Sequence, residues 1–303
     1  MKTLVIGSCA LDVYVQLPYL PSVGEDVNSN DLQMSLGGMS YNVYHIMKLF
    51  DTAPILGCPV GEGLRAEIVT SLLKVQGDKP IGVISGMDNG MCLCLVDDSR
   101  ERSFISHHGA EYRFDSKLFG SLNFDDIDWI YTSGLELEDQ DGEKIVDFLE
   151  DKKKQVFFAP GPRLDHVSSE LMNRLLGLHP VLHINEREAM LFTKEKDLFC
   201  GAEELCSRTG NAVIITLGDQ GVLLKEPGRE AQLVPTEKAA MVDSTGAGDN
   251  HAGAVLAGVS QGMTYLEALR RANFVSKYVV QQKGAVLSCE NFALAMAEWQ
   301  AVQ

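Results

Sequence analysis

The segment 243–249 combines small residues with carboxylates and leads directly into an apolar helical pattern; it reads Asp-Ser-Thr-Gly-Ala-Gly-Asp. The backbone N–H groups of Gly246, Ala247 and Gly248 can converge there on one anion, and the following helix adds the positive end of its dipole. A carboxylate at Asp249 would repel that anion, unless it takes a proton from a hydroxyl group that attacks phosphorus. The segment therefore indicates phosphoryl transfer onto a hydroxyl, with a glycine-rich turn and a helix-capping aspartate as the alternative.

Two oxygen-bearing side chains, Asn185 and Glu188, follow the apolar run 181–184 and open a helical pattern. Hard oxygen ligands at such a position suit Mg²⁺, which keeps most of its waters and binds phosphate oxygens. The same spacing is close to a capping box, in which Asn185 caps the helix and Glu188 bonds back to it. The two roles are compatible.

A second group of residues near the start of the chain suits a ligand rich in hydroxyl groups. Gly37 and Gly38 allow the backbone to approach such a ligand closely, and Asn42 offers both a donor and an acceptor. Asp12 follows the first apolar run, where it can accept hydrogen bonds from hydroxyl groups or serve as a turn residue. Later in the chain, Thr216 ends an apolar run, and Gly218 and Gly221 follow it. The spacing of these glycines fits a hairpin turn.

The elements that must position these residues alternate between apolar runs and helical patterns. Strands are predicted at 3–6, 53–58, 128–132, 155–159, 181–184, 212–216, 221–225 and 231–234. Helices are predicted at 40–50, 62–75, 139–152, 168–176, 186–193, 201–208, 247–261, 264–282 and 289–300. This alternation indicates an α/β domain with a mostly parallel central sheet, whose apolar strands are buried on both faces.

Two stretches, about 12–36 and 88–108, break this rhythm with alternating apolar residues. Residues 91–107 are typical of a hairpin, with a polar turn at 97–101. We expect the two stretches to form a small β-sheet lid over a pocket, which would exclude water during chemistry. A surface hairpin is the alternative. An apolar β-layer exposed on one side favours pairing with a second copy, so a homodimer through the lid is expected.

Composition excludes several classes of function. The chain has 26 basic and 42 acidic residues, a formal net charge of −16 that disfavours nucleic acid and anionic membrane surfaces as partners. It has no run of about 18 apolar residues that would span a membrane. The N-terminal apolar run is too short for a secretion signal, and the seven cysteines form no CxxC pair, which fits reduced thiols in the cytoplasm.

Five motifs, in order along the chain, resemble those of the PfkB, or ribokinase-like, family of sugar and nucleoside kinases. They are Asp12 after the first strand, Gly37-Gly38 with Asn42, Asn185 with Glu188, Thr216-Leu217-Gly218 with Gly221, and the segment 243–249. The resemblance implies one kinase domain over 1–303, with a ribokinase-like three-layer α/β/α sandwich and a β-sheet lid. It implies ATP and Mg²⁺, and in many relatives a monovalent cation such as K⁺.

The resemblance also assigns roles to residues. Asp249 would be the general base, beside an anion hole made by Gly246, Ala247 and Gly248. The acceptor would contact the residues Asp12, Gly37, Gly38, Asn42, Arg102 and Arg163. The nucleotide would contact Thr216, Gly218, Gly221 and, by position along the chain, Asn273. Asn185 and Glu188 would order Mg²⁺ through water, and Asp243 would help to hold the monovalent cation.

Several features bear on the acceptor. Residues 35–45 contain no Lys or Arg, which favours an unphosphorylated sugar, although Arg102 and Arg163 leave a phosphorylated one open. Tyr14 and Tyr41 could stack a base, so a nucleoside kinase is the first alternative. A non-catalytic sensor that binds sugar or nucleotide is the second. His251 departs from the family pattern, in which a Phe is common, and this puts the polarity beside the loop in question.

Overall fold

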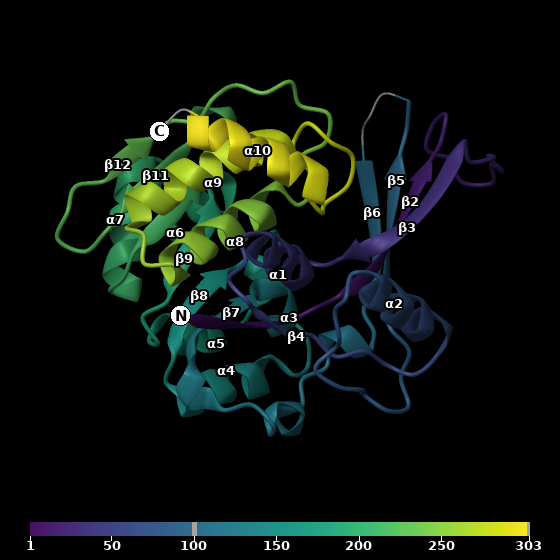
Figure 1. Cartoon of the computed structure of the whole chain (residues 1–303), viewed down its shortest axis with the longest axis horizontal. Coiled ribbons are helices and arrows are strands. Elements are labelled where there is room, and N and C mark those ends of the chain that lie inside the picture. Colours follow the sequence, from purple (N-terminus) through teal and green to yellow (C-terminus); the bar gives the residue numbers. More distant parts are fainter. Residues whose placement is uncertain (99–101, 302–303) are drawn as a thin grey trace.

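The computed structural model describes residues 1–98 and 102–301, which form two β-sheets with helices packed around the larger one (Figure 1). The larger sheet has the strand order β12-β11-β10-β9-β8-β7-β1-β4. Its strands are β1 (Lys2–Ile6), β4 (Ile55–Gly57), β7 (Ile127–Ser133), β8 (Gln155–Ala159), β9 (Val181–Asn185), β10 (Val213–Thr216), β11 (Val222–Lys225) and β12 (Gln232–Val234). The pairs from β4 to β10 are parallel, and β11 and β12 add an antiparallel edge.

The helices cover both faces of this sheet. One face is covered by α1 (Met39–Leu49), α2 (Leu64–Val75), α8 (Ala247–Ser260), α9 (Tyr265–Val279) and α10 (Cys289–Ala301). The other is covered by α3 (Gly134–Leu137), α4 (Gly142–Lys152), α5 (Ser169–Leu176), α6 (Glu186–Thr193) and α7 (Leu198–Thr209). Short 3₁₀ turns lie in the connections, at η1 (Ala110–Tyr112), η2 (Ser116–Phe119), η3 (Phe124–Asp126), η4 (Leu164–His166) and η5 (Gly218–Gln220).

Side chains along the central strands alternate between two hydrophobic cores. In β1, Val5 packs into the core beneath α1 and α8, whereas Leu4 and Ile6 pack into the core beneath α4 and α5. Each of these three side chains is almost wholly buried. The expected burial on both faces is therefore confirmed, as is the mostly parallel α/β fold.

The smaller sheet is the lid predicted from the two alternating stretches. Its strands are β2 (Ala10–Gln16), β3 (Asp31–Gly37), β5 (Met91–Val96) and β6 (Arg102–His107), in the order β3-β2-β5-β6. Figure 1 shows these four strands projecting from one side of the main body. The β5–β6 hairpin is confirmed, and part of its predicted turn, residues 99–101, lies outside the described residues.

The parallel strands direct their carboxyl ends to one edge of the large sheet. Asn185 and Thr216 end β9 and β10 side by side there, and β2 leaves β1 at the same edge to begin the lid. Open α/β sheets bind ligands at this edge, so the fold brings the predicted motifs to the usual place for a site. Within the described residues, none of the helices has the length and apolar character needed to span a membrane.

Candidate active site

A cavity of about 590 Å³ lies between the lid and the carboxyl edge of the large sheet. It is lined by predicted site residues from far apart in the chain, namely Asp12, Gly38, Asn42, Arg163, Asn185, Glu188, Thr216, Gly246, Gly248 and Asp249. These residues come from the lid, from α1, from the strand ends and from the start of α8. The structure therefore gathers most of the predicted site in one place.

The loop before α8 has the backbone geometry that an anion site needs. Gly246, the N-cap of α8, has φ +70°, and a Cβ there would lie 2.7 Å from the carbonyl oxygen of Ala285. A Cβ on Gly248 would instead project into open space, so no protein contact explains this glycine. Among the described residues, the amides of Gly246, Gly248 and Asp249 donate no hydrogen bond. The amide of Ala247 donates to the carbonyl oxygen of Ser244 at 3.2 Å, so it is not free here, and its place in the anion hole stays a prediction.

Asp249 lies in the first turn of α8 and faces Asn42 from α1. Asn42 Nδ2 donates a hydrogen bond to Asp249 Oδ2 at 2.8 Å. The pKa of Asp249 is raised to about 7, chiefly by burial and also by the nearby carboxylates of Glu136 and Glu188, while the bond from Asn42 lowers it. A carboxyl group with a pKa near neutrality can both accept and release a proton under ordinary conditions.

Asp12 lies on β2, on the face of the lid that looks into the cavity. Burial raises the pKa of this carboxyl group to about 7 as well. A Cβ on Gly37 would lie 1.9 Å from Asp12 Oδ2, so the carboxylate fits only because residue 37 is glycine. Gly37 thus acts by making room for Asp12, while Gly38 lines the cavity directly.

Asn185 and Glu188 form the capping box of α6 at the opposite side of the cavity. Asn185 Oδ1 accepts from the Glu188 amide at 2.8 Å, and the Asn185 amide donates to Glu188 Oε2 at 3.2 Å. Burial raises the pKa of Glu188 above its ordinary value. In the part of the chain that the structure describes, no three His, Cys, Asp or Glu side chains are grouped as a metal site. Hard oxygen atoms at the cavity edge fit a Mg²⁺ ion that keeps its waters and is shared with a bound phosphate.

A family model described as pfkB family carbohydrate kinase matches residues 2–291 of this chain. The chain belongs to this family. A sugar kinase of Escherichia coli (strain K12), YegV, described as uncharacterized, is 27% identical over 288 residues, which is 93% of this chain and 89% of that protein. Among solved structures, the ribokinase of Thermotoga maritima has a TM-score of 0.82 at 20% identity, covering 98% of this chain and 99% of the other. The Burkholderia thailandensis nucleoside kinase, solved with inosine, has a TM-score of 0.81 at 19% identity, covering 99% and 96%.

This membership confirms the predicted family, the ribokinase-like fold and the class of enzyme, an ATP-dependent carbohydrate kinase. The identity to these solved structures is low, and it supports the fold alone.

Several residues predicted for the kinase site lie elsewhere. Gly218 and Gly221 form the turn between β10 and β11, and a Cβ on Gly221 would lie 2.2 Å from the carbonyl oxygen of Val234. Asn273 is only 5% exposed; its Nδ2 donates to the carbonyl oxygens of Val234 and Pro235, at 3.1 Å each. Its amide is thereby committed to the protein interior, and the contact of Asn273 with the nucleotide stays a prediction. Thr216 lines the cavity beside Asn185, as expected.

The two arginines predicted to contact the acceptor are both paired with carboxylates. Arg163 lines the cavity, with Nε 2.9 Å from Glu138 Oε2. Arg102 does not line that cavity. Its Nη1 lies 2.9 Å from Asp243 Oδ1, at the wall of a neighbouring groove. The structure therefore does not bring Arg102 to the cavity, and its contact with the acceptor stays a prediction.

A buried chain of hydrogen bonds beneath the kinase site was not predicted. His183 Nε2 lies 2.8 Å from His251 Nδ1, and His251 Nε2 lies 3.0 Å from Asn273 Oδ1. Because Asn273 Oδ1 can only accept, His251 Nε2 donates to it, and His183 Nε2 donates to His251 Nδ1. Burial lowers the pKa of His251 to about 4 and lowers the pKa of His183 well below its ordinary value, so both rings are neutral near pH 7. The only feature of the sequence that pointed to this hydrogen-bond chain is that His251 departs from the family pattern.

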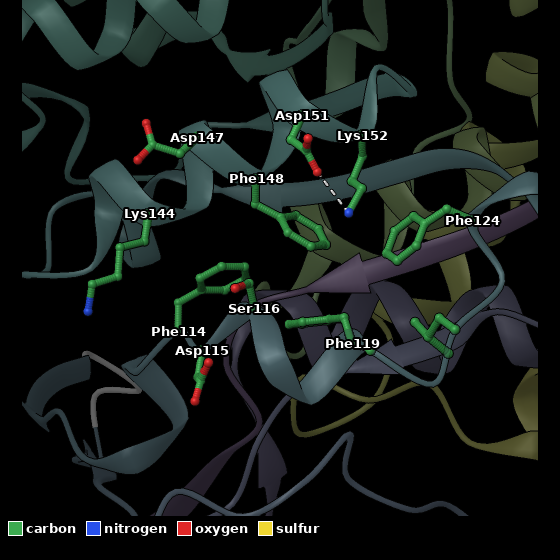
Figure 2. Close-up of a pocket in the computed structure, with 12 residues that line it drawn as sticks. Phe114, Asp115, Ser116, Phe119, Phe124, Lys144, Asp147, Phe148, Asp151 and Lys152 are labelled. Carbon is green, nitrogen blue, oxygen red and sulfur yellow. Dashed lines mark hydrogen bonds and ion pairs between the residues drawn. The ribbon is translucent and has the colours of Figure 1, made fainter.

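A second cavity, of about 840 Å³, lies away from these motifs, between the 3₁₀ turns after the lid and α4 (Figure 2). Figure 2 shows phenylalanines, including Phe124 and Phe148, that project into it beside charged side chains. Lys152 pairs with Asp151 at 2.8 Å and lies over the rings of Phe124 and Phe148. In this cavity, the aliphatic stems of charged side chains cover an aromatic surface. None of the predicted site residues lies among those that line it.

Proposed function

We propose that this kinase transfers the γ-phosphoryl group of ATP to a hydroxyl group of a small, unphosphorylated sugar, with Asp249 as general base. The observation that carries the proposal is the pair of Asp249 and Asn42 in the lid-covered cavity, with the free amides of the α8 loop beside them. We infer a single kinase domain over 1–303, closed by the lid strands.

In this mechanism the acceptor hydroxyl lies against Asp249 Oδ1, because Oδ2 already accepts from Asn42. Asp249 takes the hydroxyl proton as the oxygen attacks the γ-phosphorus; a pKa of about 7 suits a base near neutral pH. The amides of Gly246 and Gly248 and the N-terminus of α8 stabilise the negative charge that develops on the transferred group. The proton stays on the Asp249 carboxyl group, and ADP departs as the leaving group.

The acceptor is held by groups that suit neutral hydroxyls. The Asp12 carboxylate accepts hydrogen bonds from them, and Asn42 Oδ1 is a buried acceptor without a partner among the described residues. The positive charge of Arg163 is compensated by Glu138, and the carboxylates of Asp12 and Glu188 line the same cavity. A phosphate on the acceptor would meet excess negative charge there, which favours an unphosphorylated sugar.

Asn185 and Glu188 would hold Mg²⁺ through water at the cavity edge. Mg²⁺ bound there supplies positive charge that offsets the charge of the nucleotide phosphates. Thr216, next to Asn185 in the sheet, places its side chain on the same side of the cavity and would contact the nucleotide.

A nucleoside acceptor is less well supported by the aromatic residues. Tyr41 is 1% exposed, and Tyr14 lines the neighbouring groove instead of the cavity. Neither of these two rings is placed to stack a base in the cavity, although Phe104 and Tyr112 do line it.

We also propose that the kinase forms a homodimer through the outer face of the lid. Leu32, Met34 and Ile105 lie on the face opposite Asp12, and each is about half exposed. An apolar sheet face of this kind is typically covered by a partner, and a second copy supplies the same surface.

The test is a coupled assay of ADP release with MgATP and a panel of ketoses, aldoses, sugar acids, nucleosides and sugar phosphates. We expect turnover on one class of neutral sugar, and a loss of kcat by orders of magnitude in Asp249→Asn without loss of folding. Unchanged turnover in Asp249→Asn would refute the general base. Silence on every acceptor, with ATP still bound in calorimetry, would favour the non-catalytic sensor.

A further inference from the structure

The carboxylate of Asp243 binds groups from three separate segments of the chain. Its Oδ1 accepts from the Thr245 amide at 2.7 Å, and its Oδ2 accepts from the Gly284 amide at 2.9 Å. Arg102, from lid strand β6, places Nη1 2.9 Å from the same Oδ1. Asp243 therefore ties the loop before α8 to the segment around Gly284 and to the lid.

Arg102 makes a second contact with the same loop. Its Nη1 donates to Oγ1 of Thr245 at 3.1 Å, and Thr245 directly precedes the glycine that caps α8. The side chains of Arg102 and Asp243 are 19% and 9% exposed, so their charges are only weakly screened by water. The guanidinium is positively charged at every accessible pH, so it compensates the Asp243 carboxylate permanently.

This pairing disagrees with the cation role that the family resemblance assigns to Asp243. A monovalent cation at this carboxylate would have to lie beside a fixed guanidinium, and the like charges would repel each other. Asp31, Asp97, Asp98 and Lys283 also line the groove next to Asp243. Within the described residues, Arg102 is the cationic side chain that the structure pairs with Asp243.

We propose that Arg102 takes the place of a dissociable monovalent cation at Asp243, so that this kinase does not depend on K⁺. The guanidinium neutralises Asp243 and holds Thr245, which orders the loop that carries Gly246 and Gly248. Because Arg102 belongs to the lid, closure of the lid also completes the loop. The cationic group at Asp243 is thus a side chain of the protein, the Arg102 guanidinium, and it reaches Asp243 when the lid closes.

The inference rests on the proposed function for its relevance to catalysis, and its test is read without turnover. We would measure the thermal midpoint Tm and the affinity for ADP by calorimetry, in KCl and in choline chloride at equal ionic strength. The wild-type protein is expected to show the same Tm and the same ADP affinity in both salts. Arg102→Met is expected to bind ADP ~10-fold more weakly in choline chloride, as for the loss of one charge-assisted contact.

The decisive comparison is rescue of the variant. K⁺ or methylguanidinium should raise the Tm of Arg102→Met and restore most of its ADP affinity, while leaving the wild type unchanged. Arg174→Met is the matched control, because Arg174 is likewise paired with carboxylates, those of Asp147 and Glu150, and lies outside the lid. It should respond to neither cation. If Arg102→Met does not fold, Arg102→Gln removes the charge and keeps a donor for Thr245.

Two results would overturn the inference. One is a wild-type protein whose Tm and ADP affinity rise with K⁺ over choline. The other is an Arg102 variant that neither K⁺ nor methylguanidinium restores, since the guanidinium would then not be acting as a cation. Failure of phosphoryl transfer on every acceptor would instead refute the proposed function, and it would leave both of these readouts intact.

Discussion

Removal of the Asn42 amide should move the pH dependence of the reaction in a defined direction. Asn42 Nδ2 donates to Asp249 Oδ2 at 2.8 Å, and this bond favours the ionised carboxylate. In Asn42→Leu the bond is lost and the site becomes more apolar, so the pKa of Asp249 must rise from about 7. Leu has the same number and branching of side-chain heavy atoms as Asn, and residue 42 is 4% exposed, so the substitution leaves no cavity.

The size of the shift follows from the strength of the bond. A hydrogen bond to a charged group contributes about 1.5–3 kcal/mol, and one pKa unit corresponds to about 1.4 kcal/mol. The pKa of Asp249 should therefore rise by about 1–2 units in Asn42→Leu. The base must be ionised to act, so activity is lost as the pH falls through this pKa, and the loss should begin at higher pH in the variant.

The assay is the pH dependence of kcat/KM for the acceptor, which reports ionisations of the free enzyme. Loss of the Asn42 contact with the sugar lowers kcat/KM at every pH, so the position of the acid limb is the readout, and its height is not. Asp12 also has a pKa of about 7, and Asp12→Asn serves as the control that removes this second ionisation. An acid limb that stays in place or moves to lower pH in Asn42→Leu would refute the assignment of Asp249 as the base.

Three other predictions test the fold around the site. Gly248→Ala should fold with an unchanged or higher Tm, because its Cβ meets no protein atom and alanine favours helices, while kcat falls because the methyl group occupies the space left for the phosphate. The folded-state pKa of His251 is about 4 against 6.5 unfolded, so its share of stability is complete above pH 6.5 and should fall by about 3 kcal/mol towards pH 4. The pH dependence of the unfolding free energy should therefore be shallower in His251→Gln; equal slopes would contradict this. Met34→Lys with Ile105→Lys should convert the lid dimer to monomers in sedimentation, and a wild-type protein that sediments as a monomer would refute the interface.

The regular elements of the fold could be predicted from the sequence because periodicity and strand length determine them locally. Every predicted strand and helix of the main body is present, within a few residues at its ends. The helix α3 was missed, because four residues, Gly134–Leu137, are too few to show a helical period. The lid strands were found through their alternation, although β2 begins at Ala10, two residues before the predicted stretch.

Two predicted site residues lie away from the cavity for a common physical reason. Asn273 was assigned by its position along the chain and Arg102 by the resemblance of its segment to the family, and the partners of both come from distant segments that the sequence does not place. Asn273 bonds to the carbonyl oxygens at the end of β12, and Arg102 to a carboxylate 141 residues later, at Asp243. His183 lies in an apolar strand, and nothing local indicated that its ring meets His251.

The contact between Asn42 and Asp249 shows how packing completes what the motifs only suggest. Each motif places one of the two residues at a helix start, in α1 and in α8, and the contact requires these helices to lie very close. Gly253 allows this, one turn after Asp249: a Cβ there would lie 2.3 Å from Ile46 Cγ2 and 2.8 Å from the Val43 carbonyl oxygen. The missing side chain lets the backbone of α8 approach α1 beside Asn42. Gly253 therefore acts through helix packing, and so sets the distance at which Asn42 reaches the base.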